Sequence, residues 1–162
     1  MLEKTGIPTS DDINSVLPDE ERLKKGPVAV IECFREIPCD PCYFSCPFEA
    51  INEFDDINDK PELDFDKCTG CQSCIANCPG LAIFVVDYNK STVTIPYEFL
   101  PLPKKGDIVA GLNRKGEKVC DAEVIKIKDP DKNDKTAVIT LKVPREYLME
   151  VRNIKVGDQD GR

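Results

Sequence analysis

Cysteine spacing is the strongest constraint on this 162-residue chain, because eight of its nine cysteines fall between positions 33 and 78. They form two groups of four. The total is odd, and the N-terminal residues lack the apolar stretch of a secretory signal, so a disulfide framework is not expected. Thiols at this density predict a bound metal centre. The eight are Cys33, Cys39, Cys42, Cys46, Cys68, Cys71, Cys74 and Cys78.

The second group runs from Cys68 to Cys78 with the form C-x2-C-x2-C-x3-C, and Pro79 follows it. In this pattern three thiolates converge on one iron–sulfur cube, while the fourth points toward a second cube. Zinc is the alternative metal, but zinc ribbons use two separated C-x2-C pairs, which this run does not match. The spacing favours iron–sulfur chemistry, with a zinc-stabilised scaffold or redox sensor as the remaining alternative.

The first group ends in the same C-x2-C-x3-C-P form, from Cys39 to Pro47, but five residues separate Cys33 from Cys39. Doubling the length of such a loop adds only about 0.6 kcal/mol of closure entropy, so Cys33 can still be a ligand. Alternatively, Cys33 is a buried structural thiol at the edge of a strand. The first site would then have three protein ligands and favour a three-iron cluster. Both interpretations stay open at this point.

Charge is distributed unevenly along the chain. Residues 28–90 hold four Lys or Arg and twelve Asp or Glu, and the whole chain has a formal net charge of -8. Such an acidic protein is not expected to bind nucleic acid. Histidine is absent, which excludes Ser-His and Cys-His catalytic pairs, and no apolar run is long enough to span a membrane. We therefore expect no catalytic site on this chain.

Composition divides the chain into four segments. Residues 1–27 are predicted to be an N-terminal arm, with one helical turn around Ile13 capped by Ser10 or Asp11. Residues 28–90 form the cysteine-rich domain, residues 91–156 a small β-barrel-like module, and residues 157–162 a frayed tail. Within 28–90, two strands are expected, at 28–32 and 81–88. A short helix is expected at 48–54, with Pro47 at its start.

The module at 91–156 shows alternating apolar residues that predict two antiparallel strands, at 119–128 and 136–143. The alternation slips in phase near Ile125, which one extra residue at a β-bulge would explain. Residues 129–134 read as the turn between these strands. Tyr147, Val151 and Ile154 would share one face of a helix after Pro144. Cys120 lies in step with the apolar face of the first strand and is expected to be a small buried residue.

Residues 28–87 resemble bacterial-type ferredoxins with two [4Fe-4S] clusters. The strings from Cys46 to Ile51 and from Leu63 to Pro79 carry this resemblance, with Ala82 and Ile83 beyond them. It implies a pseudo-twofold α+β unit that carries electrons, followed here by the mostly antiparallel β module. It also implies crossed ligation, in which each half lends one cysteine to the other half's cluster. Cys33, Cys39, Cys42 and Cys78 would hold the first cluster, and Cys68, Cys71, Cys74 and Cys46 the second.

The string from Ile31 to Cys42 is similar, more weakly, to ferredoxin-like small subunits of FAD-dependent amino-acid or amine dehydrogenases of the proline, hydroxyproline or sarcosine type. No G-x-G-x-x-G fingerprint is present, so FAD is expected on a partner chain. The resemblance implies an electron-transfer subunit that relays electrons between a flavoprotein dehydrogenase and an external acceptor. A free-standing ferredoxin with an added β module is the alternative. The acidic surface predicts docking to a carrier with a basic patch, and a cytoplasmic location is expected.

Overall fold

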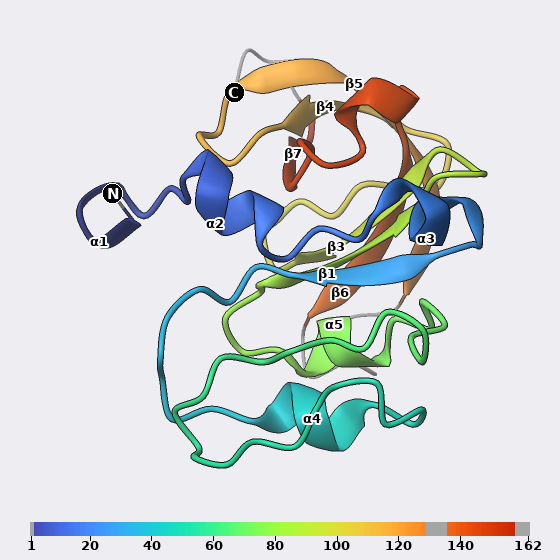
Figure 1. The fold of residues 1–162 in the computed structure, drawn as a ribbon. Coiled ribbons are helices and arrows are strands. Elements are labelled where there is room, and N and C mark those ends of the chain that lie inside the picture. Colours follow the sequence, from blue (N-terminus) through green and yellow to red (C-terminus); the bar gives the residue numbers. More distant parts are fainter. Residues whose placement is uncertain (1, 129–135, 158–162) are drawn as a thin grey trace.

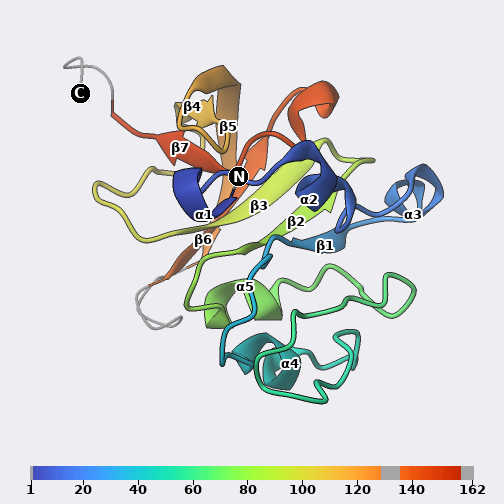
Figure 2. The ribbon, with the colours of Figure 1, turned by 60° about the vertical axis from the view of Figure 1, so that its left-hand side comes forward.

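The computed structural model describes residues 2–128 and 136–157. One antiparallel sheet of seven strands forms its centre, in the order β1-β2-β3-β6-β5-β4-β7 (Figure 1). Short helices lie around its β1 end, with α2 (Ser10–Asn14) and α3 (Glu20–Lys24) on one side and α4 (Pro41–Ser45) and α5 (Ser73–Asn77) with the cysteine loops on the other (Figure 2). In α1 (Leu2–Thr5), Leu2 and Glu3 line a cavity together with Cys33 and Cys39. The architecture confirms the predicted α+β class. The strands are β1 (Val28–Ile31), β2 (Ile83–Asp87), β3 (Thr92–Tyr97), β4 (Ile108–Leu112), β5 (Lys118–Lys128), β6 (Ala137–Lys142) and β7 (Asn153–Lys155).

The sheet continues through the expected boundary at residue 90. β2 pairs with β3 across a tight turn, with Val85 opposite Thr94 and Asp87 opposite Thr92. The Asp87 carboxylate accepts the Lys90 N–H at 3.1 Å, and Ser91 takes a positive φ of 56°. The cysteine-rich segment and the β module therefore share one hydrogen-bonded ladder, while their separate folding as domains stays a prediction.

Strands β1 and β2 are buried on both faces, which explains why they read as continuous apolar runs rather than as alternating ones. Val30 and Val86 point into a core that they share with residues of the β module, such as Leu141. Ala29 and Val85 point to the opposite face, where they contact the cysteine loops. These two strands thus form a wall between two apolar cores.

The predicted β-bulge is confirmed, because the register between β5 and β6 shifts between Val124 and Lys126. Cys120 is half-buried on β5 and packs at the margin of the core. The expected turn at 129–134 lies outside the described residues, as does the tail from 158 onward. The predicted strand at 136–143 is confirmed as β6.

The helix expected after Pro144 is wrong. Residues Arg145–Tyr147 make a single 3-10 turn, and the chain then extends into β7, which pairs with β4. Val151 and Ile154 are buried, as an apolar periodicity implies, but Val151 ends the turn, with its N–H donating to the Tyr147 carbonyl at 3.0 Å, and Ile154 lies in β7. A period of three to four residues over only three positions does not distinguish a helix from a turn followed by a strand.

The N-terminal arm folds onto its own chain through three short helices, α1 (Leu2–Thr5), α2 (Ser10–Asn14) and α3 (Glu20–Lys24). Thr9, rather than Ser10 or Asp11, caps α2, and it forms a reciprocal capping box with Asp12. Val16, Leu17 and Leu23 pack against the main core. No helix within 2–128 or 136–157 is long and apolar enough to cross a membrane.

The helix expected at 48–54 is also wrong, and its displacement has a clear cause. We call residues 28–90 the cysteine unit. Its helices are α4 (Pro41–Ser45) and α5 (Ser73–Asn77), and both end just before a Cys-Pro pair. A proline disfavours helical geometry in the residue before it, so Pro47 stops a helix instead of starting one. Pro41 occupies the first helical position, where its missing N–H costs nothing.

A buried ion triad ties the β module to the start of the first cysteine loop. Glu32 follows β1 directly, and its carboxylate accepts hydrogen bonds from the guanidinium groups of Arg114 and Arg152, the latter at 3.2 Å. Arg152 also stacks over the Phe84 ring at 4.8 Å. Burial lowers the pKa of Arg152 to about 10, so the group keeps its charge at neutral pH.

Replacing Arg152 by Met is expected to destabilise the protein by about 3 kcal/mol, since it breaks part of a buried charge network. The change also removes the donor for the Leu148 and Val151 carbonyls. Arg145→Met is the matched control, because that exposed side chain stacks on Tyr88 at 4.4 Å and should contribute at most about 1 kcal/mol. Thermal unfolding of anaerobic protein, followed by circular dichroism, compares the two. Equal losses would contradict a dominant role for the triad.

Candidate metal centres

The two halves of the cysteine unit repeat the same local geometry around their Cys-Pro pairs. Cys46 ends α4 with φ -80° and ψ 110°, and Cys78 ends α5 with φ -81° and ψ 111°. Three residues later, Glu49 and Leu81 both take a positive φ, of 51° and 53°. The two halves therefore repeat one local turn geometry, as a pseudo-twofold unit requires.

The same turn supplies an amide to each of these two sulfurs. The Ala50 N–H donates to Cys46 Sγ at 3.3 Å, and the Ala82 N–H donates to Cys78 Sγ at 3.4 Å. Amide donors of this kind stabilise thiolate sulfur and fix its orientation. The geometry therefore prepares the last cysteine of each half to act as a thiolate ligand.

Four cysteines line a cavity of about 420 Å³, and Ile31, Phe34, Ile37 and Ile83 contribute to its apolar lining. Its cysteines are Cys33, Cys39, Cys42 and Cys78. Three come from the first half of the unit and one from the second, which is the grouping that crossed ligation requires.

The other four cysteines border a smaller hollow on the opposite side of the unit, against Ala29 of β1 and Val85 of β2. They are Cys46, Cys68, Cys71 and Cys74. Here the first half contributes one thiol and the second half three. The Ala29 N–H donates to Cys68 Sγ at 3.4 Å, so the sheet itself supplies a donor to this group.

The electrostatics of the thiols reflect the same grouping. Burial raises the pKa of Cys42 to about 11, and the neighbouring Cys78, Cys33 and Cys39 also contribute. Burial raises the pKa of Cys74 to about 12, with further contributions from Cys68, Cys71 and Cys46. The pKa values of Cys42 and Cys74 are thus each raised by the other three cysteines of the same group, so bare thiolates in one group would repel one another. Cationic iron relieves that repulsion when it binds.

Cys71 differs from the other thiols because its pKa is lowered. Its partial burial raises the pKa, but hydrogen bonds from the side chain and backbone of Ser73 and from the Thr69 side chain outweigh that effect. Neither hydroxyl was singled out by spacing arguments. A polar residue next to each ligand of a C-x2-C-x2-C run is the signal that could have identified them.

Cys33 lies at the first cavity in spite of its long gap to Cys39. It is half-buried two residues beyond β1, and burial raises its pKa, with smaller contributions from Cys78 and Cys39. The longer loop therefore still brings this thiol to the group. The structure thus brings all eight predicted residues together in two groups of four, although their role as ligands stays a prediction. In 2–128 and 136–157, no three Cys, Asp or Glu are arranged to hold a single metal ion.

Comparison with known proteins agrees with this geometry. Residues 37–82 match the 4Fe-4S dicluster domain family. Pyruvate synthase subunit PorD of Methanocaldococcus jannaschii is 41% identical over 54 residues. That alignment covers 33% of this chain and 60% of the PorD subunit, so the chain spans less than two thirds of this relative. No solved structure matches. The family match and the eight cysteines identify the segment as a domain for two [4Fe-4S] clusters.

Proposed function

We propose that this chain is an iron–sulfur electron-transfer subunit of a larger oxidoreductase. The observation that carries the proposal is the division of eight thiols into two groups, each assembled from both halves of one compact unit. The clusters supply one-electron chemistry. The chain's residues hold the sulfur atoms in place, donate amides to them and surround them with apolar side chains. We include a cytoplasmic location in this proposal, since cluster thiolates must stay reduced.

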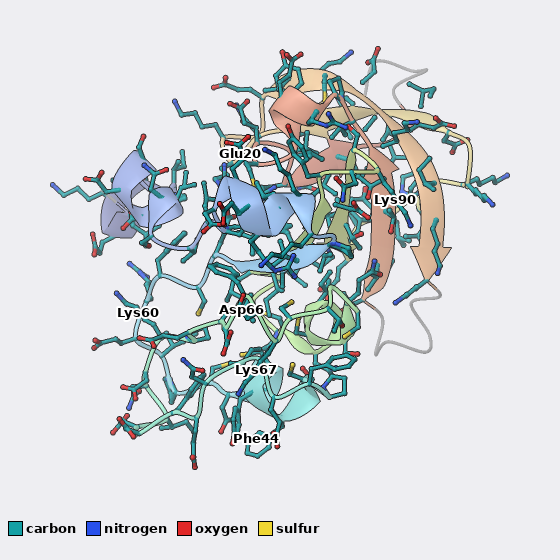
Figure 3. The ribbon with its side chains drawn as sticks, turned by 45° about the vertical axis from the view of Figure 1, so that its right-hand side comes forward. Glu20, Phe44, Lys60, Asp66, Lys67 and Lys90 are labelled. Atoms are coloured by element: carbon teal, nitrogen blue, oxygen red, sulfur yellow. The ribbon has the colours of Figure 1, made fainter. Side chains whose placement is uncertain are left out.

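An exposed surface made by residues 36–62, called here the 36–62 surface, supports docking to a basic partner. Phe44 is 75% exposed and stacks edge-on against Tyr43, two residues after Cys42. Figure 3 shows Phe44 at the outer end of the cysteine unit, far from the sheet. Around it the surface exposes further apolar side chains and many carboxylates. They are Ile37, Phe48 and Ile57, and Glu36, Glu49, Glu53, Asp55, Asp56, Asp59 and Glu62.

Such a surface suits transient docking, because carboxylates steer a basic partner and exposed apolar groups give short-range contact. The partner class is the finer part of the proposal. A flavoprotein dehydrogenase with FAD on its own chain is the partner that the Ile31–Cys42 string suggests. The partial relation to a pyruvate synthase subunit favours a second candidate, a pyruvate synthase-like assembly. Purification of the native complex, with identification of co-eluting chains and a flavin assay, separates the two.

Metal content tests the ligand assignment. Anaerobically purified chain should contain about eight iron and eight sulfide, as two four-iron clusters require. Cys33→Ser should lose iron from the first centre and leave the EPR signal of the second intact. Cys120→Ser is the matched control and should keep the full iron content, because Cys120 lies on β5 and lines neither group. Two zinc ions per chain, or full iron in Cys33→Ser, would contradict the assignment.

Electron transfer to cytochrome c, a basic one-electron acceptor, tests the docking surface. The rate constant at low ionic strength should fall severalfold in a double variant Asp55→Asn and Asp59→Asn, and the difference should shrink as salt is added. Glu123→Gln is the matched control, since Glu123 is an exposed carboxylate on β5, outside the cysteine unit. Equal rates in all three proteins would remove the 36–62 surface from the proposal.

Size measurement separates a subunit from a free carrier. Native material should elute well above the 18.1 kDa of this chain, together with other polypeptides. A monomer with intact clusters in a native extract would instead support the free-standing ferredoxin.

A further inference from the structure

Arg22 is a buried cation at the second cysteine group, and it comes from the N-terminal arm rather than from the cysteine unit. Its side chain lies on α3 and is only 9% exposed. The guanidinium donates to the Cys68 carbonyl at 2.7 Å and to the Phe65 carbonyl at 2.6 Å. It also donates to the carbonyls of Gly26 and Pro27, at 3.1 and 3.0 Å. One side chain thus joins the arm, the entry to β1 and the second cysteine loop.

Within residues 2–128 and 136–157, Arg22 has no bonded carboxylate, since all four of these acceptors are neutral carbonyl oxygens. Asp19, Glu21, Asp64 and Asp66 border the same surface hollow. Water and salt screen the exposed carboxylates of Asp19, Glu21 and Asp66, while the half-buried Asp64 carboxylate accepts the Asp66 N–H at 3.0 Å. Figure 3 shows Asp66 between the N-terminal helices and the helices of the cysteine unit.

The first cysteine group has a different electrostatic neighbourhood. The buried cations near it, Arg114 and Arg152, both bind the Glu32 carboxylate, which immediately precedes Cys33. The triad as a whole therefore carries a net charge of +1, and its one negative charge stands on the residue next to the Cys33 thiol. The two centres therefore differ: one has a cation bonded only to carbonyls, and the other has cations bonded to an anion.

We propose that Arg22 raises the reduction potential of the second centre above that of the first, so that a single electron on this chain resides at the second centre. Reduction adds one negative charge to a centre, and a fixed buried cation stabilises the more negative state. Arg22 acts through the backbone at Cys68 and is a positioning residue as well as a charge. The inference rests on the proposed ligand groups. It gives the N-terminal arm a redox role beyond packing.

Redox titration of the anaerobic full-length chain, followed by EPR, tests this inference. Arg22→Met should lower the potential of the second centre by at least 59 mV, which is a tenfold change in the reduced-to-oxidised ratio of a one-electron couple. The first centre should move much less. Arg22→Lys keeps the charge and should shift the second centre by less than Arg22→Met. Lys24→Met is the matched control on the same helix, because Lys24 is exposed and pairs with Glu20.

Iron and sulfide content measured on the same samples separates two kinds of failure. Native protein without clusters would contradict the proposed function. Intact clusters with an unshifted second centre in Arg22→Met would overturn only the present inference. If Arg22→Met does not fold, Glu32→Gln provides the second test. It frees the charge of two arginines beside Cys33 and should raise the potential of the first centre, and an unchanged or lower value would overturn the inference.

Discussion

The interlocking of two cysteine-bearing stretches is the constraint on which the rest of the structure depends. Cys46 ends the first half but lies with the second group, and Cys78 ends the second half but lies with the first. Neither half can assemble its group alone. The matching backbone geometry at the two Cys-Pro pairs makes this exchange symmetric, with an amide donor to each exchanged sulfur.

The interlocked unit is small, and the remainder of the chain supports it from two directions. Strands β1 and β2 close one side, and their far faces complete a core with the β module. The arm closes another side through Arg22, and the β module reaches the first loop through the Glu32 triad. Both connections are buried and charged. Such connections depend on geometry more than apolar contacts do, because a buried charge that loses its partner lowers the stability of the fold.

Apolar patterning was sufficient to predict the strands β1, β2 and β6 and the bulge near Ile125, while the resemblance to two-cluster ferredoxins implied the grouping of the cysteines. These features depend on local pattern and on ligand chemistry, both of which are visible in the order of residues. The helices are harder to predict. Proline is common in the first turn of a helix, but it also ends a helix that precedes it, and Pro47 does the second. The helix predicted after Pro144 is wrong because three apolar positions fit both a helix and a turn followed by a strand.

The long-range polar contacts could not be predicted from the sequence. Arg22 is one cation among 22 Lys and Arg, and nothing in its neighbourhood marks it as buried at a carbonyl cluster 46 residues away. Glu32 and Arg152 are 120 residues apart, so their pairing follows from the closing of the sheet and not from a motif.

The shared sheet has a consequence for how this architecture could have arisen. Severing the chain near residue 90 would strip β2 of its neighbour β3 and uncover the faces of Val30, Phe84 and Val86 that now meet the β module. We therefore expect the cysteine unit, separated from the β module, to present an apolar face to water. A stand-alone version of the unit would be better suited to water with polar residues at these three positions.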